Sequence, residues 1–301
     1  MSDRLRGSSA NILKRPAACG LLWLSLLSPP AMAVDITSLW DFGNPALSEQ
    51  RFRDALNGAS ADEALILQTQ IARSYGLRNE AERGRALLAS ISEAAKHASP
   101  EVRARYALEL GRTWASAAHT PESQTAETRE TARRLYTEAF ETARDAKLDY
   151  LAIDALHMMA FVDTAPEAQL AWDLKALAYM ESSPQAGAKR WEGSLRNNIG
   201  YALHEQGRYD EAMAQFRLAL AAREREGKAE RIREAWWMIA WTLRAQGKLD
   251  DALAIQLRLA READAAGKPD PDVFEELELL YRAKGDETRA TAYAAKRQAA
   301  G

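Results

Sequence analysis

The side chains best suited to binding another molecule lie in two stretches of the sequence that are 40 residues apart. Trp237 and Trp241 are four residues apart, which places both indoles on one face of a helix. The equivalent positions of the earlier stretch hold Asn197 and Tyr201. Tryptophan and tyrosine bury a large area with few rotamers, and an asparagine amide can both donate to and accept from a peptide backbone. These residues indicate a surface that binds a protein or peptide. The alternative is that the indoles pack against a neighbouring hairpin or the C-terminal helix.

Residues that support catalysis or metal binding form no recognisable pattern in the sequence. The four histidines do not have the spacing of metal ligands, and Cys19 is the only cysteine. There is no glycine-rich phosphate loop and no Gly-x-Ser-x-Gly elbow. Paired carboxylates such as Glu275 and Glu276 are expected on solvated helix faces. The sequence therefore predicts a protein that is not an enzyme and that carries no metal or cofactor. A buried carboxylate with a strongly perturbed pKa in a groove would instead favour an enzyme, or an accessory domain of one.

The elements that position the aromatic residues are repeated. Residues 206–212 and 246–252 spell nearly the same phrase, and each copy reads as helix, tight turn, helix. Gly207 and Gly247 are expected to end the first helix in the left-handed conformation. Asp210 then places a carboxylate near the start of the second helix, where free N–H groups favour it. An internal period of this length is typical of a stacked helical repeat.

The clearest copy resembles the tetratricopeptide repeat. The residues that carry the resemblance are, in order, Gly200, Leu203, Gly207, Tyr209, Ala212, Phe216 and Ala219. Trp236 fills that family's tryptophan position in the second copy, whereas Gln256 replaces the aromatic residue and Arg196 stands at the tryptophan position of the first. The period of 40 is longer than the family's usual 34 and is similar to an elongated variant. The resemblance implies an all-α, right-handed superhelical solenoid of about five hairpins.

The repeats are expected to cover residues 59–301. The clearest copies span residues 193–226 and 233–266, and weaker copies span 60–98, 100–147, 149–183 and 271–300. An insertion from about residue 116 to 130 splits one of the weaker copies. Ser60 and Glu63 have the spacing of a capping box at the start of the first repeat. No long run alternates with a period of two, so no sheet is predicted.

The resemblance also implies a binding groove, because tetratricopeptide proteins bind extended peptides on the concave face of their first helices. Transferred residue by residue, the candidate groove residues are Asn197, Tyr201, His204, Trp237, Trp241 and Arg244. A weaker alignment adds Arg73, Arg112 and His157. Of these three, the arginines also suit a solvated surface and His157 also suits the core. The expected partner is a protein or peptide whose carboxylate an arginine can bind.

The N-terminus reads as a secretory signal peptide over residues 1–33. Four basic residues precede an apolar run at 17–27, and the small residues Ala31 and Ala33 suggest cleavage after Ala33. The apolar run is too short to span a bilayer comfortably, so no transmembrane segment is expected after cleavage. Cleavage would remove Cys19 and leave 36 basic and 42 acidic side chains, a net charge near −6. A periplasmic or secreted protein without a nucleic-acid partner is therefore expected.

Residues 34–58 lie between the leader and the first repeat. This segment is aromatic and rich in turn residues, and it contains a short helical stretch from Ser48 to Leu56. It is interpreted as a cap over the end of the repeats, with a docking segment for another protein as the alternative. A second function class also stays open, because exposed tryptophans stack on sugar rings. A cleft with paired acidic residues beside Trp237 and Trp241 would favour binding of glycans or cell-wall fragments.

Overall fold

The computed structural model describes residues 34–300, which form helices and turns but no strand. The prediction of an all-α protein is therefore confirmed for this part of the chain. The signal peptide expected at residues 1–33 lies outside the described residues.

The helical elements follow one another with short connections. Their bounds are α1 Ile36–Leu39, α2 Pro45–Ala55, α3 Ala61–Gly76, α4 Ala81–Lys96, α5 Pro100–Arg112, η1 Pro121–Ser123, α6 Ala126–Asp145, α7 Asp149–Met159, α8 Pro166–Ser182, η2 Ala188–Trp191, α9 Glu192–Glu205, α10 Tyr209–Glu226, α11 Ala229–Ala245, α12 Leu249–Ala265, α13 Pro271–Ala283 and α14 Glu287–Ala300. Both η elements are short 3-10 helices.

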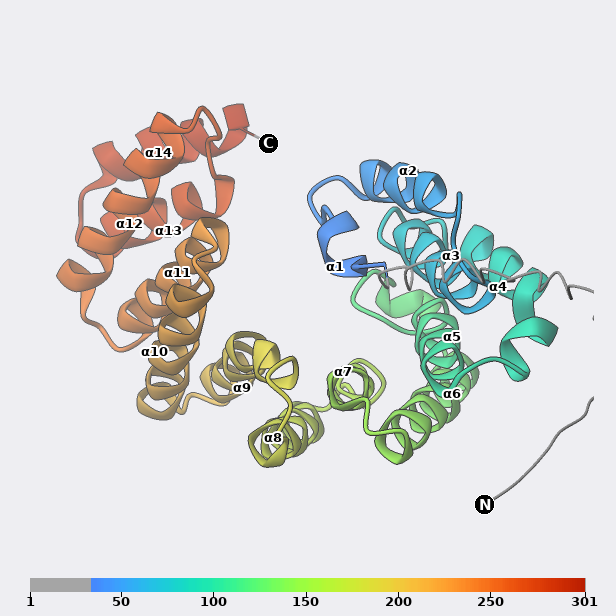
Figure 1. Cartoon of the computed structure of the whole chain (residues 1–301). Coiled ribbons are helices and arrows are strands. Elements are labelled where there is room, and N and C mark those ends of the chain that lie inside the picture. Colours follow the sequence, from blue (N-terminus) through green and yellow to red (C-terminus); the bar gives the residue numbers. More distant parts are fainter. Residues whose placement is uncertain (1–33, 301) are drawn as a thin grey trace, which may run out of the picture. The chain divides into compact units, whose positions relative to one another are not determined.

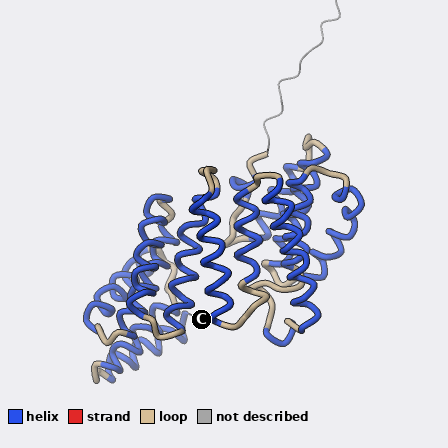
Figure 2. Tube along the Cα trace, turned by 90° about the horizontal axis from the view of Figure 1, so that it is seen from below, coloured by secondary structure: helices blue, strands red, loops and turns tan. Residues whose placement is uncertain are grey.

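Helices α3 to α14 pair as hairpins. Within residues 34–300 there are six, close to the five expected. Each hairpin packs against the next, and the hairpins follow one another in a curved row (Figure 1). Figure 2 shows the same helices from below, as neighbouring rods joined by short loops. First helices of adjacent hairpins also touch each other directly, as α3 does with α5, and α5 with α7. The first helices of the first three hairpins therefore lie side by side.

Local turn chemistry explains where the helices begin and end. Gly207 and Gly247 have φ values of 73° and 74°, the left-handed conformation that a side chain disfavours. Pro100 and Pro271 occupy first turns, where the missing N–H is not needed. The capping box forms as predicted: Ser60 Oγ accepts from Glu63 N–H, and the Ser60 N–H donates to Glu63. Asp210 lies in the first turn of α10 but does not cap it, because it accepts a hydrogen bond from Gln246 instead.

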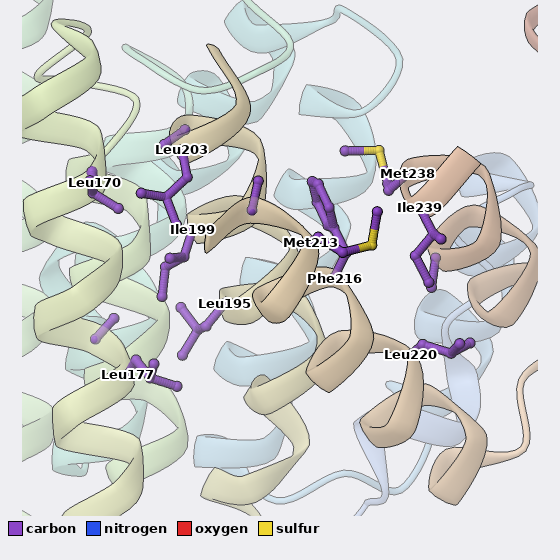
Figure 3. Close-up of a cluster of buried hydrophobic side chains, with 14 of the residues drawn as sticks. Leu170, Leu177, Leu195, Ile199, Leu203, Met213, Phe216, Leu220, Met238 and Ile239 are labelled. Carbon is purple, nitrogen blue, oxygen red and sulfur yellow. The ribbon is translucent and has the colours of Figure 1, made fainter. Parts of the chain in front are cut away.

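Within a hairpin, a small residue on the first helix faces a large residue on the second. A Cβ atom added to Gly200 would lie 2.6 Å from a ring carbon of Phe216, and one added to Gly111 would lie 2.6 Å from Tyr136. Phe216 is fully buried, and burial of such a side chain contributes about 2–3 kcal/mol. Figure 3 shows Phe216 among Ile199, Met213 and the other apolar residues that join the hairpins around it.

The insertion predicted near residues 116–130 is shorter than expected. The irregular stretch ends at Thr125, because residues 126–130 already belong to the helix α6. Thr125 accepts a hydrogen bond from the Thr128 N–H and thereby caps that helix. The loop is held in place by Tyr136, whose hydroxyl donates to the Ala115 carbonyl, and by the His119 ring, whose Nε2 lies 3.1 Å from the Thr113 carbonyl.

The N-terminal segment packs onto the first hairpin. Helix α2 begins at Pro45 rather than Ser48, because the Asn44 side chain accepts from the Leu47 N–H and caps the helix there. Phe52 of α2 and Leu67 of α3 are both fully buried in one apolar cluster. Residues 34–56 therefore cover apolar side chains of α3 that would otherwise be exposed to water.

Candidate functional site

A groove of about 830 Å³ runs along the first helices of the N-terminal hairpins. It is open to solvent along one side, and its wall includes α1, α3, α5, α7, η2 and α9. The side chains that define the groove here are Trp40, Arg73, Glu109, Arg112, Tyr150, Asp154, His157, Trp191 and Asn197. Four of them were candidates from the sequence, namely Arg73, Arg112, His157 and Asn197.

A buried ion network of Arg73, Glu109, Arg112 and Asp154 forms part of the groove wall. Arg112 of α5 forms ion pairs with Glu109 on its own helix and with Asp154 of α7. Arg73 of α3 lies 3.8 Å from the same Glu109 oxygen. The side chains of Glu109 and Asp154 are only 2% and 3% exposed. The network therefore links three successive hairpins through two buried carboxylates, whereas Arg73 is 26% exposed.

The pKa values in this network follow from burial and from the opposite charges. Burial opposes ionisation of Asp154, but Arg112 and Arg73 outweigh it, so the pKa of this carboxyl is lowered. Burial also opposes the charge of Arg112, yet Asp154 and Glu109 raise its pKa above the usual value for arginine. Asp154 and Arg112 are therefore charged at neutral pH, and Asp154 is an ionised partner rather than a proton donor.

Aromatic rings flank the charged residues of the groove. The Arg73 guanidinium carbon lies 5.5 Å from the ring centroids of both Trp40 and Phe42, which stack on each other. Further along, the Arg190 guanidinium carbon lies 5.7 Å from the ring of Tyr150. Arginine beside aromatic rings is favourable for cation–π contact and also presents planar donors to a ligand.

His157 lies in the groove next to residues of three other elements. Its Nδ1 is 3.4 Å from Asp173 Oδ1 on α8 and 3.3 Å from the Asn198 amide nitrogen on α9. Its ring is 5.3 Å from the ring of Trp191, measured between centroids. His157 is therefore half-buried and held by Asn198 and Trp191 of the same wall and by Asp173 behind it.

Two buried oxygen atoms of the groove wall accept no hydrogen bond within residues 34–300. They are Oε2 of Glu109 on α5 and Oδ1 of Asn197 on α9. The other Glu109 oxygen receives Arg112 and faces Arg73, so the two oxygens of this carboxylate differ. A buried acceptor without a donor is unfavourable by about 1–3 kcal/mol. Both atoms have almost no exposed surface, so they are unpaired acceptors inside the wall rather than atoms that face the open groove.

Four of the remaining candidates from the sequence form a separate aromatic cluster between α9 and α11. They are Tyr201, His204, Trp237 and Trp241. Trp241 lies 3.3 Å from His204, 5.7 Å from Tyr201 and 5.9 Å from Trp237 between ring centroids, in near-parallel stacks. Burial, followed by the positive charge of Arg244, lowers the pKa of His204 to about 4. None of these side chains is among the residues that line the groove. Whether they contact a partner stays a prediction.

Arg244 is the last candidate from the sequence, and the structure places it against the next hairpin. Its Nε and Nη2 donate to the two carboxylate oxygens of Glu276 on α13, both at 2.8 Å. This bidentate pair occupies the guanidinium face that a ligand carboxylate would use. Arg244 therefore joins α11 to α13 in the described structure.

A smaller cavity of about 450 Å³ lies beside Trp237, between α11 and α13. Its wall carries carboxylates of Glu230, Glu234, Asp270 and Asp272, together with Arg233. Arg233 pairs with Asp270 at 3.3 Å. The indole nitrogen of Trp237 is buried and makes no hydrogen bond to residues 34–300.

Several groove residues escaped the sequence interpretation. Glu109 and Asp154 are ordinary acidic residues of helices until the hairpins are stacked, and Trp40 belongs to a segment interpreted as a cap. One usable signal exists: Arg73 and Arg112 are 39 residues apart, and Glu109 lies one helical turn before Arg112. That spacing predicts an ion pair on the same helix face but not its partner on α7.

Two further properties bear on the class of protein. Within residues 34–300, no helix is long and apolar enough to cross a membrane. The same residues contain no group of three or more histidine, cysteine, aspartate or glutamate side chains arranged to hold a metal ion.

Comparison with known proteins supports the repeat assignment. Residues 191–261, which include α9 to α11 and most of α12, match the tetratricopeptide repeat model. This match contains the first of the two copies that are clearest in the sequence and most of the second. No curated protein matches the chain in sequence.

Two solved structures are similar in fold. One is a signal transduction ATPase with numerous domains from Pyrococcus horikoshii, which has a tetratricopeptide repeat sensor. It is 13% identical to this chain, with a TM-score of 0.61, and the likeness covers 85% of this chain and 39% of that chain. The chain thus spans about two fifths of that protein. The other is PilW, a type IV pilus biogenesis factor, 18% identical with a TM-score of 0.54, over 78% of this chain and 93% of that chain. At these identities the likeness shows the fold, an all-α helical repeat superhelix.

Proposed function

We propose that this protein is a non-catalytic scaffold that binds an extended segment of another protein in its groove. The observation that carries the proposal is the wall of the groove, on which Arg73, Tyr150 and Asn197 of three first helices lie along one open space. An extended peptide exposes a backbone N–H at every second residue on each side, and these groups need acceptors when they leave water. The side-chain amide of Asn197, which is half-buried on this wall, can both donate to and accept from such a backbone.

Side-chain chemistry of the groove supports a peptide over a small rigid ligand. Arg73 is within reach of solvent and is not engaged bidentately, because its nearest carboxylate oxygen in the described chain is 3.8 Å away. Tyr150 is 38% exposed and lies beside Trp191, so the wall also offers aromatic area. Arginine and aromatic side chains are the residue types that dominate binding energy at protein interfaces.

A catalytic role has less support. Asp154 is a deeply buried carboxylate in the groove, but Arg112 and Arg73 lower its pKa despite burial. A general acid requires the opposite, a carboxyl group whose pKa is raised towards the working pH. The residues of the ion network are therefore interpreted as structural and ligand-orienting groups.

We also propose that the protein acts in the periplasm or outside the cell, after cleavage of the leader. The charged, apolar and small-residue order of residues 1–33 supports this. Loss of Cys19 would leave a chain without disulfides, which the stacked apolar core of the hairpins can stabilise unaided.

The groove is tested with peptides selected from a random library against the wild-type chain. The selected peptides are then titrated against Asn197→Ala and Glu109→Gln variants, with Leu218→Ala, an exposed residue of α10, as the matched control. Loss of one or two hydrogen bonds should weaken binding about three- to tenfold for Asn197→Ala. Peptides that bind all variants equally well would overturn the assignment of the groove.

A second candidate function is binding of glycans or cell-wall fragments at the smaller cavity. The observation in its favour is the cleft beside Trp237, which carries four carboxylates suited to sugar hydroxyls. Titration with soluble muropeptides, followed by tryptophan fluorescence, tests it. A response that Trp237→Phe abolishes would favour glycans, whereas no response in either protein would exclude this cavity as a glycan site.

A further inference from the structure

The N-terminal segment, residues 34–42, forms one end of the groove wall and is attached to α3 at two places. Ile36, Thr37, Trp40 and Phe42 of this segment line the groove. At its end, the Trp40 indole N–H donates to Gln70 Oε1 at 3.1 Å. At its beginning, the Val34 N–H donates to Glu63 Oε1 at 3.2 Å.

Glu63 uses its two carboxylate oxygens for different partners. Oε2 completes the capping box by accepting from Ser60 N–H at 2.9 Å and from the Ser60 hydroxyl at 2.7 Å. Oε1 accepts only from Val34 N–H among the described residues. The carboxylates next to these residues have other partners: Asp35 accepts from Thr37 N–H, and Asp62 accepts from Ser99 N–H. Glu63 is therefore the acidic group that directly faces the Val34 nitrogen.

We infer that hydrolysis of the peptide bond between Ala33 and Val34 creates an α-ammonium group that forms an ion pair with Glu63 and thereby fixes residues 34–42 in the groove wall. This inference rests on the proposed export and leader cleavage. In the reaction, a leader peptidase breaks the C–N bond by adding water. The water oxygen becomes part of the Ala33 carboxylate, and both water hydrogens end on the Val34 nitrogen, which becomes –NH₃⁺.

The consequence is a change in the strength of an existing contact. Before cleavage the Val34 nitrogen is a neutral amide that donates one hydrogen bond to Glu63. After cleavage the same atom is a cation with three donors, and an α-amino group has a reference pKa of about 7.7–8.0. The carboxylate acceptor already makes this hydrogen bond charge-assisted, and the positive charge on the donor adds the Coulomb attraction of two opposite charges. The processed chain should therefore hold its N-terminal segment more firmly than the precursor does.

The inference is tested on the full chain, expressed with its leader in an exporting bacterial host and purified after processing. N-terminal sequencing must identify Val34 as the first residue. The α-amine is then labelled with an amine-reactive ester at pH 7, and the labelled N-terminal peptide is quantified by mass spectrometry. The variants are Glu63→Gln, in which glutamine can still complete the capping box, and Asp62→Asn as the neighbouring control.

An ion pair with Glu63 should keep the α-amine of Val34 protonated and therefore unreactive. Wild type should be labelled about three- to tenfold more slowly than Glu63→Gln. This ratio corresponds to a difference of about half to one unit in the pKa of the α-amine. Asp62→Asn should be labelled like wild type. Insertion of one glycine between Ala33 and Val34 should move the amine away from Glu63 and give the faster rate.

Two results would overturn the inference. One is an N-terminus other than Val34 in the exported chain, which would leave the groove proposal intact because the peptide titrations test that separately. The other is equal labelling of wild type, Glu63→Gln and the glycine insertion, which would show that Glu63 does not pair with the α-amine.

Discussion

Replacement of Gln256 by methionine should stabilise this protein. Gln256 lies on α12, is fully buried, and makes no hydrogen bond through either amide atom to residues 34–300. Forty residues earlier, the same position of the repeat holds Phe216, which is also fully buried and packs against Gly200. The second copy therefore places a polar amide where the first copy places an apolar ring.

The expected magnitude follows from the desolvated amide. Mutational data give about 1–3 kcal/mol for a buried amide without a partner. Methionine is similar in length, has no strong hydrogen-bonding group and adapts to irregular space. We therefore expect Gln256→Met to raise the free energy of unfolding by about 1–3 kcal/mol. For a chain of this size, each kcal/mol corresponds to about 2–4 °C in Tm.

The assay is urea unfolding followed by far-ultraviolet circular dichroism, with thermal melts as a second measurement. The matched control is Gln298→Met on α14, because Gln298 is exposed and a surface substitution should change stability by less than about 0.5 kcal/mol. Comparison of m values checks that both proteins unfold in the same transition. If Gln256→Met unfolds at the same or a lower urea concentration than wild type, the amide is not an unpaired buried group and the reasoning is refuted.

Three further predictions concern the core, the ion network and pH. Gly200→Ala should destabilise the protein by about 1–3 kcal/mol, because the added Cβ would lie 2.6 Å from Phe216. Gly187→Ala should leave the stability unchanged, because an added Cβ there has nothing within 4 Å. The urea midpoints of the two variants test this difference. Arg112→Met should lower the free energy of unfolding by about 3–5 kcal/mol, because two buried carboxylates lose their arginine partner. A loss below about 1 kcal/mol would contradict the burial of the network. The pKa of His204 is about 4, below its ordinary value of 6.5, so the unfolded chain binds a proton between these pH values that the folded chain does not. The stability of wild type should therefore fall from pH 6.5 to pH 4 by about 1–2 kcal/mol more than that of His204→Phe, and parallel curves from urea unfolding at several pH values would contradict the lowered pKa.

The hairpins were predictable from the sequence because their signals are local. Gly207 and Gly247 end helices through a conformation that depends on a few neighbouring residues, and Ser60 and Glu63 form a capping box within a single turn. The fold class follows from the repetition of these signals. The boundary after the longer loop was less accurate: Thr125 is a possible N-cap residue in the sequence, but only the structure shows that it starts α6 at Ala126.

The site was predictable only in part, because it depends on contacts between hairpins. Helical spacing placed Trp237 and Trp241 on one face but not the residues opposite, and the structure stacks Trp241 against Tyr201 and His204 of the preceding hairpin. Asp154 reaches Arg112 across 42 residues of sequence, and no periodicity encodes that contact. The groove therefore depends on the packing of successive hairpins, which places α5 beside α7. Helical spacing within one hairpin does not predict it.

The buried ion network has a consequence for how this chain can change during evolution. Repeat proteins commonly gain and lose whole repeats by duplication or deletion of one unit in the gene, since each repeat contacts only its neighbours. Deletion of the hairpin α5–α6 would remove Glu109 and Arg112 together and leave Asp154 buried without its arginine partner. Removal of α7–α8 would leave the Glu109–Arg112 pair without its second carboxylate. We expect natural variation in the number of hairpins to arise on the C-terminal side of α8, with α3, α5 and α7 inherited as a block.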